Sequence, residues 1–227
     1  MGFQITILLL VAVLGQIRPY SARFTQVTVD NSRADTVRGT VYFAAPWRVY
    51  YQVDYPINQL VSAVMNEMSI YYPEESLAYV IRANSQFEAP TSQQSLGTID
   101  PAQAMSQIGL RPSNTHTSGD TVYSVWIPKD RSAAFGRFTF GRVGRATVYV
   151  EAVRRNGKPI VRSRMSDHMS VDTFELPTRI STERFDAAGR RSLESLTYTA
   201  LDTSTAFLKG LARFAIPPGI RTRTRNW

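Results

Sequence analysis

The 227-residue chain contains no cysteine and only two histidines, His116 and His168. Disulfide bonds and thiolate metal sites are therefore excluded. The two histidines are far apart in the sequence and lie in polar, turn-like surroundings, so we expect neither a histidine-based metal site nor a catalytic triad. Stability must come from a well-filled core, for which 43% hydrophobic and 11% aromatic residues are sufficient.

Recognisable catalytic motifs are also missing. The sequence has no nucleophile elbow, no Walker phosphate loop and no zinc-ligand spacing. Gly136, Gly141 and Gly144 are spaced like kinks in strands and not like a phosphate loop between a strand and a helix. We therefore expect that the protein is not an enzyme and that it needs no cofactor and no metal.

Charged residues are absent from the first fifteen positions. The apolar run from Ile5 to Gly15 is too short to span a bilayer and has the length of the hydrophobic part of a secretion signal. Val13 and Gly15 suit cleavage between Gly15 and Gln16, so residues 1–15 are expected to be a signal peptide and the protein periplasmic. Because no Lys or Arg precedes the run, an uncleaved anchor is the alternative.

Positive charge is in excess, with a formal net charge of +8. The basic residues concentrate between Arg131 and Arg164, where only Glu151 opposes them, and again between Arg221 and Arg225. An exported protein meets little nucleic acid, so we expect no nucleic-acid partner; an anionic membrane surface or an acidic partner fits the charge better. Solvated strand faces that carry arginine for solubility are the other interpretation.

Alternation of apolar and polar residues dominates the rest of the chain and predicts antiparallel β-structure. Between Trp47 and Tyr55, for example, every second residue is apolar. Turn sequences such as Asn156-Gly157 separate the segments, so a meander or barrel-like sheet is expected. The predicted strands are 40–43, 47–55, 60–64, 68–72, 77–82, 122–127, 135–140, 146–153, 159–165, 178–185 and 192–200.

A different pattern interrupts the strands between residues 100 and 109. Asp100 is placed as an N-cap, Pro101 as the first helical residue and Gly109 as the stop, which predicts a short helix. Met105 and Ile108 lie on its apolar side. Because a helix of about two turns does not persist alone, that side must rest on other residues, either as a cap on the core or as a movable lid over a cavity. A second helix is expected near 205–212.

Several short motifs occur in a set order: Phe24-Thr25-Gln26, Gly39 to Pro46, Pro56, Tyr71-Tyr72-Pro73 and Phe214 to Gly219. Their order and spacing resemble the LolA-type outer-membrane lipoprotein carriers, a family that opens with a helix ending in Phe-Thr-Gln. The resemblance implies an α+β, mainly β fold, namely an antiparallel, incomplete β-barrel (half-barrel) with a short helical lid. It also implies a single domain over residues 16–227, with a truncated first helix before Phe24.

The resemblance further implies a monomeric periplasmic carrier that binds acyl chains of lipoproteins, or related lipids, in a hydrophobic groove. Such a carrier passes its cargo from an inner-membrane donor complex to an outer-membrane acceptor. A sensor or adaptor of the same fold, or a secretion accessory protein, would bind a protein partner instead and is the alternative. The groove-lining candidates, each of which is equally compatible with ordinary core, are Val41, Phe43, Trp47, Val49, Tyr51, Met68, Ile70, Met105, Ile108, Phe138 and Phe140.

A latch that holds the lid is the last feature implied by the resemblance. In that family a basic residue directly before the first Pro forms the latch, and Ala45 occupies this position here. The latch is therefore absent or replaced. Arg48 is the candidate replacement, and Asp100 and Pro101 are the expected start of the lid.

Overall fold

The structure is a computed structural model, and it describes residues 19–30, 33–45, 48–64, 66–82, 105–106, 109–130, 136–171 and 174–226. The expected signal peptide lies outside these ranges, and so do Trp47, Asp100, Pro101 and Ile108. What the sequence suggests for them stays a prediction.

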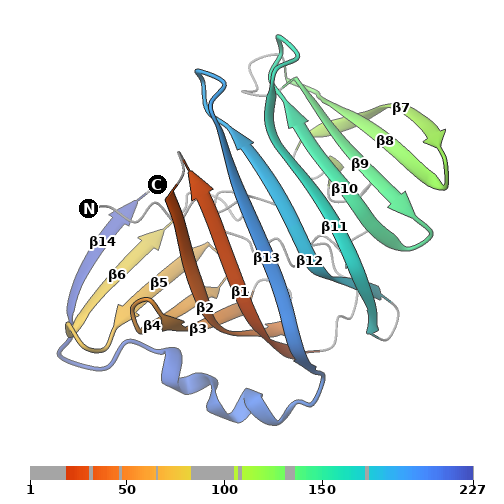
Figure 1. Cartoon of the computed structure of the whole chain (residues 1–227). Coiled ribbons are helices and arrows are strands. Elements are labelled where there is room, and N and C mark those ends of the chain that lie inside the picture. Colours follow the sequence, from red (N-terminus) through yellow and green to blue (C-terminus); the bar gives the residue numbers. More distant parts are fainter. Residues whose placement is uncertain are drawn as a thin grey trace. The chain divides into compact units, whose positions relative to one another are not determined.

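Fourteen strands and a 3₁₀-helix make up most of the described residues (Figure 1). Cross-strand pairing is antiparallel along the meander, for example between β4 and β5, whereas β14 pairs with β6 in parallel. The elements are β1 Tyr20–Asp30, β2 Arg33–Ala45, β3 Arg48–Tyr55, β4 Gln59–Val64, β5 Glu67–Tyr72, β6 Leu77–Arg82, β7 Leu110–Ser118, β8 Thr121–Pro128, β9 Arg137–Val143, β10 Ala146–Val153, β11 Pro159–Val171, β12 Phe174–Phe185, β13 Arg191–Asp202, η2 Ala206–Phe214 and β14 Arg221–Asn226.

Hydrogen bonds join the strands into one sheet in the order β14-β6-β5-β4-β3-β2-β1-β13-β12-β11-β10-β9-β8-β7. The order has two different ends, β14 and β7, so the sheet is open. The predicted fold class, a mainly β, antiparallel and incompletely closed sheet, is confirmed. Each of the predicted strands falls within or overlaps an observed one.

Residues 24–26 correct one expectation. The helix expected to end there is wrong, because Phe24, Thr25 and Gln26 lie in the middle of strand β1. Tyr20, Ala22 and Phe24 are buried in alternation with more exposed neighbours, which is the period of a strand with one buried face. The alternation of Tyr20, Ala22 and Phe24 with other residues is visible in the sequence, but the Phe-Thr-Gln motif led to the prediction of a helix.

Two further strands were not predicted. The sequence shows β14 only as a concentration of basic residues, since Arg221 to Asn226 contain no apolar residue. β7 is polar apart from Leu110 and contains Pro112, and the register with β8 shifts between Pro112 and Asn114. Both strands stand at ends of the sheet order, where polar residues and proline are tolerated because a second neighbour is not needed there.

The helical predictions are partly tested. The helix expected near 205–212 is confirmed by the 3₁₀-helix η2. Of the segment 100–109, residues 105–106 are helical, Met105 is fully buried, and Gly109 has the positive φ of 78° expected of a helix stop. The remaining lid residues lie outside the described ranges, so the lid stays a prediction.

The described residues group into two compact units. Unit 1 consists of the described residues within Met1–Arg23, Arg38–Leu96 and Ala200–Trp227 and contains β3 to β6, β14 and η2. Unit 2 consists of the described residues within Phe24–Val37 and Gly97–Thr199 and contains β7 to β12 and most of β13. The single domain expected over 16–227 stays a prediction.

Gly39 marks a close approach between β2 and β3 in unit 1. The register of the two strands shifts between Arg38 and Gly39. A Cβ atom on Gly39 would lie 2.0 Å from the carbonyl oxygen of Gln52, which is inside van der Waals contact with backbone that cannot rotate away. Glycine is therefore required here by space.

We expect Gly39→Ala to lower the free energy of unfolding by about 1–3 kcal/mol, because the overpacking cost exceeds the gain of about 0.5–1 kcal/mol from replacing a glycine within a strand. Gly210→Ala is the control, since nothing lies within 4 Å of the point on η2 where its methyl group would stand. That change should be neutral or stabilise by about 0.4–1 kcal/mol. Denaturant unfolding measures both, and equal stability of the two variants would contradict the steric argument.

Candidate functional site

One face of the sheet in unit 1 is apolar across four strands. Cross-strand pairs place Val41 beside Tyr51, Phe43 beside Val49, Val61 beside Tyr51 and Ile70, and Met68 beside Ala63. Residues opposite each other on neighbouring strands share a face. We call this face, formed by Val41, Phe43, Val49, Tyr51, Val61, Met68 and Ile70, the unit 1 apolar face.

The structure thus brings together six of the residues predicted to bind cargo: Val41, Phe43, Val49, Tyr51, Met68 and Ile70. All but the half-buried Tyr51 are buried, from 0% exposure for Val41 to 7% for Ile70. Their burial is compatible with a binding face and with ordinary core, so their role in binding stays a prediction.

Three residues of this face form a cluster that the sequence analysis identified only in part. Val61, Met68 and Ile70 pack together, and Tyr51, Tyr72 and Ile81 pack against them. Val61, Tyr72 and Ile81 were not among the predicted site residues. The alternation within their strands was visible, but assigning them to this face needs the register between β4, β5 and β6.

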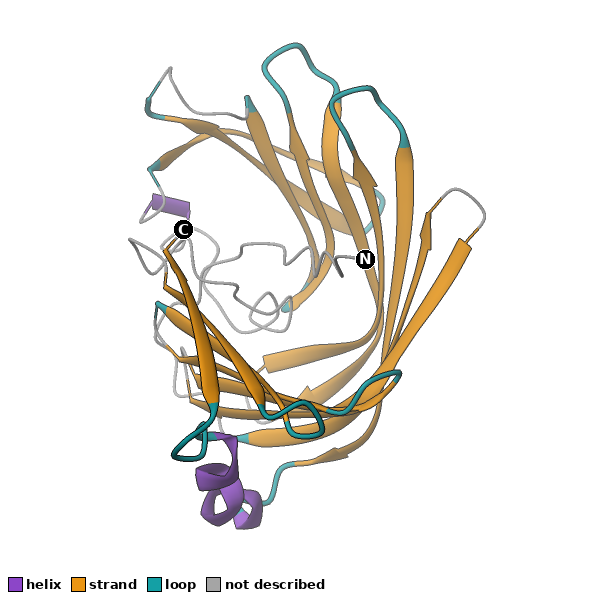
Figure 2. Ribbon diagram, turned by 90° about the vertical axis from the view of Figure 1, so that its left-hand side faces the viewer, coloured by secondary structure: helices purple, strands orange, loops and turns teal. Residues whose placement is uncertain are grey.

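The opposite face of unit 1 is packed against η2. The ring of Phe214 lies 5.7 Å from that of Tyr42 and 5.1 Å from that of Tyr50, and the Phe207 ring lies 5.5 Å from Tyr42. The Arg213 guanidinium donates a 2.7 Å hydrogen bond to the Tyr42 hydroxyl. Tyr42 and Tyr50 alternate with the residues of the apolar face, so η2 covers the other side of the strands (Figure 2).

Arg48, the predicted replacement latch, is exposed at the start of β3. It is two residues from Tyr50 along the strand and opposite Val64, so alternation puts it on the face of η2 and not on the apolar face. The latch role stays a prediction, and this position does not favour it.

Tyr20 extends the aromatic content of unit 1. Its ring stacks on Phe43 with centroids 5.1 Å apart and planes 13° from parallel, and both side chains are buried. Burial, with a smaller contribution from Tyr51, raises the pKa of the Tyr20 hydroxyl far above its ordinary value. The hydroxyl is therefore neutral at any physiological pH and adds no charge beside the apolar face.

Unit 2 has an apolar face of its own. Phe138 and Phe140 on β9 have ring centroids 4.9 Å apart. Phe138 lies opposite Trp126 on β8 and Ala152 on β10, and Phe140 lies opposite Val150. The face continues through β11 and β12. We call Trp126, Phe138, Phe140, Val150, Ala152, Val161, Met165 and Ile180 the unit 2 apolar face; all are buried.

A strip of polar side chains lies on the same side of unit 2. The hydroxyl oxygens of Ser163 and Thr182 are 2.9 Å apart, and Thr182 lies opposite Glu194. The Arg184 guanidinium is 3.4 Å from the Glu194 carboxylate, with side-chain exposures of 16% and 10%. Buried charges persist when they are paired, so this pair belongs to the structure of the sheet.

The opposite face of unit 2 carries a network of arginines around two glutamates. Glu151 binds Arg162 at 2.9 Å, and Glu183 binds Arg191 at 2.9 Å and Arg162 at 3.5 Å. The hydrogen bonds that the Arg162 guanidinium donates to the Glu151 carboxylate raise the pKa of Arg162. Part of the basic excess between Arg131 and Arg164 is thus used in ion pairs within the sheet. Contact with an anionic membrane surface stays a prediction.

Comparison with solved structures gives the fold. A DUF1329 family protein from Desulfovibrio piger matches with a TM-score of 0.61 at 14% identity, over 88% of this chain and 90% of that one. A LolA superfamily protein from Nitrosomonas europaea matches with 0.53 at 15% identity, over 83% and 87%. A domain named for outer membrane lipoprotein sorting, from Vibrio parahaemolyticus, matches with 0.57 at 10% identity, over 83% and 86%.

The chain has a LolA-like fold. No protein-family profile and no curated protein sequence matches it, so the likeness rests on structure. At these identities the likeness establishes the LolA-like fold and leaves the cargo of this protein to be proposed.

The described residues also bear on metal binding and on membrane-spanning helices. Within the described residues no group of three or more His, Asp or Glu side chains is arranged to hold a metal ion. Nor does the described part contain a helix with the length and apolar character needed to cross a membrane.

We expect Arg184→Met to lower the free energy of unfolding by about 3 kcal/mol, because the buried Glu194 carboxylate loses its ion-pair partner. The control is Arg164→Met. Arg164 has a 65% exposed side chain 3.9 Å from Glu183, and its removal should cost at most about 1 kcal/mol. Denaturant unfolding distinguishes the two, and a small loss for Arg184→Met would show that the pair is not needed in the sheet.

Proposed function

We propose that this LolA-like protein is a periplasmic carrier that binds the acyl chains of lipoproteins, or of related lipids, and passes them from an inner-membrane donor to an outer-membrane acceptor. It works by binding and release, without catalysis. The observation that carries the proposal is the unit 1 apolar face, which lies on the side of the strands opposite to η2.

The two faces of unit 1 differ in what they contact. A sheet in a small protein usually buries one face and leaves the other to water. Here the face of Tyr42 and Tyr50 already has its cover, since η2 packs on it through Phe214. The other face is nonetheless apolar on β2, β3, β4 and β5. This second apolar face, buried except at the half-buried Tyr51, supports a role in binding.

The chemistry of this face suits acyl chains. Moving one methylene from water to an apolar surface gains about 0.8 kcal/mol, so even a single chain supplies several kcal/mol. The face offers aliphatic, aromatic and thioether groups such as Val41, Phe43 and Met68. These contacts are not directional, and the flexible thioether of Met68 adapts to chains of varied shape.

Release of the cargo is explained by the same non-directional apolar contacts. Binding that depends on apolar area alone has no set of hydrogen bonds that must be broken at once, and cargo moves to whichever partner binds it more tightly. The neighbour named for outer membrane lipoprotein sorting supports this class of cargo.

The test is native mass spectrometry with lipid extraction on the protein purified from its native periplasm. We expect bound lipid or acylated peptide. Tyr51→Glu should reduce the retained cargo at least about tenfold, because a carboxylate on the apolar face must lose its hydration when a chain binds. Both Tyr51 and its cross-strand neighbour Val41 belong to that face.

Thr40→Glu is the matched control. It introduces the same charge at another half-buried position, on the opposite face of the neighbouring strand, and should leave cargo unchanged. Thermal unfolding of both variants checks that each is folded. A protein that emerges without lipid and instead copurifies with another envelope protein would reject the carrier and favour an adaptor of the same fold.

A further inference from the structure

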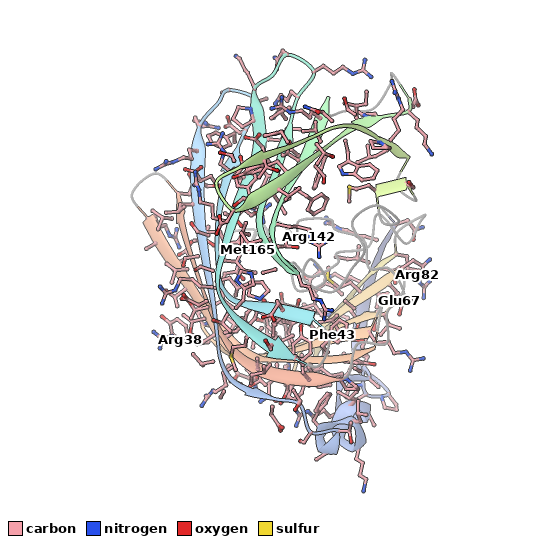
Figure 3. All side chains as sticks on the ribbon, turned by 90° about the vertical axis from the view of Figure 1, so that its right-hand side faces the viewer. Arg38, Phe43, Glu67, Arg82, Arg142 and Met165 are labelled. Atoms are coloured by element: carbon pink, nitrogen blue, oxygen red, sulfur yellow. The ribbon has the colours of Figure 1, made fainter. Side chains whose placement is uncertain are left out.

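Arg142 stands on the same side of β9 as the two phenylalanines of the unit 2 apolar face. Phe138, Phe140 and Arg142 alternate along the strand and therefore share a face. Gly141 points to the other side, because a Cβ there would lie 2.9 Å from the side chains of Tyr123 and Tyr149. Figure 3 marks Arg142 on β9 together with Met165, another residue of this face.

The guanidinium of Arg142 is incompletely bonded. One of its terminal nitrogens donates a 3.3 Å hydrogen bond to the carbonyl oxygen of Arg145 in the following turn. Its Nε atom is buried and finds no acceptor among the described residues. The Nε atom of Arg184, on the same face, is likewise buried without an acceptor. The two arginines differ in their carboxylates: Arg184 pairs with Glu194, whereas no described carboxylate lies within ion-pair distance of Arg142.

The nearby acidic residues cannot serve Arg142 because they are on the opposite face. Glu151 and Glu183 project there and bind Arg137, Arg162 and Arg191. Arg142 is a half-buried cation on the same strand face as two phenylalanines, and a charge at such a position favours an anionic partner. Guanidinium groups pair strongly with carboxylate and phosphate through two hydrogen bonds. Carboxylate and phosphate are also the anionic groups that amphiphilic ligands carry.

We propose that Arg142 binds the anionic group, a carboxylate or a phosphate, of a ligand whose acyl chain lies along the unit 2 apolar face. This inference rests on the proposed acyl-chain binding and adds a polar anchor to it. Four residues of strand separate Phe138 from Arg142, about 13 Å at 3.3 Å per residue. An extended chain held at Arg142 runs past Phe140 and Phe138 and reaches Trp126 opposite.

The experiment compares three ligands with the same twelve-carbon chain: dodecanoate, dodecyl phosphate and dodecanol. Each displaces a neutral fluorescent acyl probe from the full chain. We expect the wild-type protein to bind at least one anionic ligand about tenfold or more tightly than dodecanol, the range of one charge-assisted hydrogen bond. Added salt should weaken binding of the anionic ligand and leave dodecanol unaffected.

In the Arg142→Met variant, the affinities for the two anionic ligands should fall to within about twofold of the affinity for dodecanol. The affinity for dodecanol itself should stay unchanged, since the methionine keeps the apolar contacts. Arg142→Lys should keep part of the preference. The matched control, Arg164→Met, removes the same charge from the opposite face of unit 2 and should keep all of it. Preference for dodecanoate alone or for dodecyl phosphate alone supports the anchor and identifies the anion.

Each remaining outcome rejects a different statement. Equal affinity of the wild-type protein for all three ligands overturns the anchor and leaves acyl-chain binding intact. Failure to bind even dodecanol overturns acyl-chain binding itself. A preference that survives in Arg142→Met places the anion elsewhere and overturns the role of Arg142. Should that variant not fold, the salt dependence of the wild-type protein decides the question, because binding without an ionic contact is insensitive to salt.

Discussion

Side chains that follow one another in a β-strand point to opposite faces of the sheet, and the register between strands carries this alternation from one strand to the next. In unit 1 it separates Tyr50, which contacts η2, from Tyr51, which belongs to the apolar face. A register shift of one residue would exchange the two. Gly39 contributes to the register because β3 approaches β2 too closely for a side chain at this position.

The same constraint sorts the charges of unit 2. Glu151, Arg162 and Glu183 lie opposite one another on β10, β11 and β12 and form a network on one face. On the other face, the described residues combine apolar side chains with the buried ion pair of Arg184 and Glu194. The proposed anion binding depends on this separation of the glutamates from Arg142, because an arginine paired with glutamates would not be available to bind an anionic ligand. The proposed acyl-chain binding depends on it because it keeps the carboxylates of the network off the apolar face.

The sequence predicted most of the strands because alternation is a local property. Val41, Val49 and Tyr51 were correctly assigned to strands, and the register then placed them on one face. Strand β14 could not be foreseen in the same way, since Arg221 to Asn226 have no apolar period, and pairing with β6 is a long-range contact. Arg142 was one of many arginines in a basic segment. What distinguishes it is the face on which it stands and the carboxylates that it lacks.

Strand β14 has a consequence for solubility. An exposed sheet edge is a template on which another chain can add a strand, and β6 would present such an edge if the chain ended before β14. Instead β14 pairs with β6 and presents arginines at 221, 223 and 225, with Arg223 over the ring of Tyr79 at 5.9 Å. A second molecule that approached this edge in the same way would bring like charges together. The arginines of strand β14 thus oppose the pairing of two molecules along this edge.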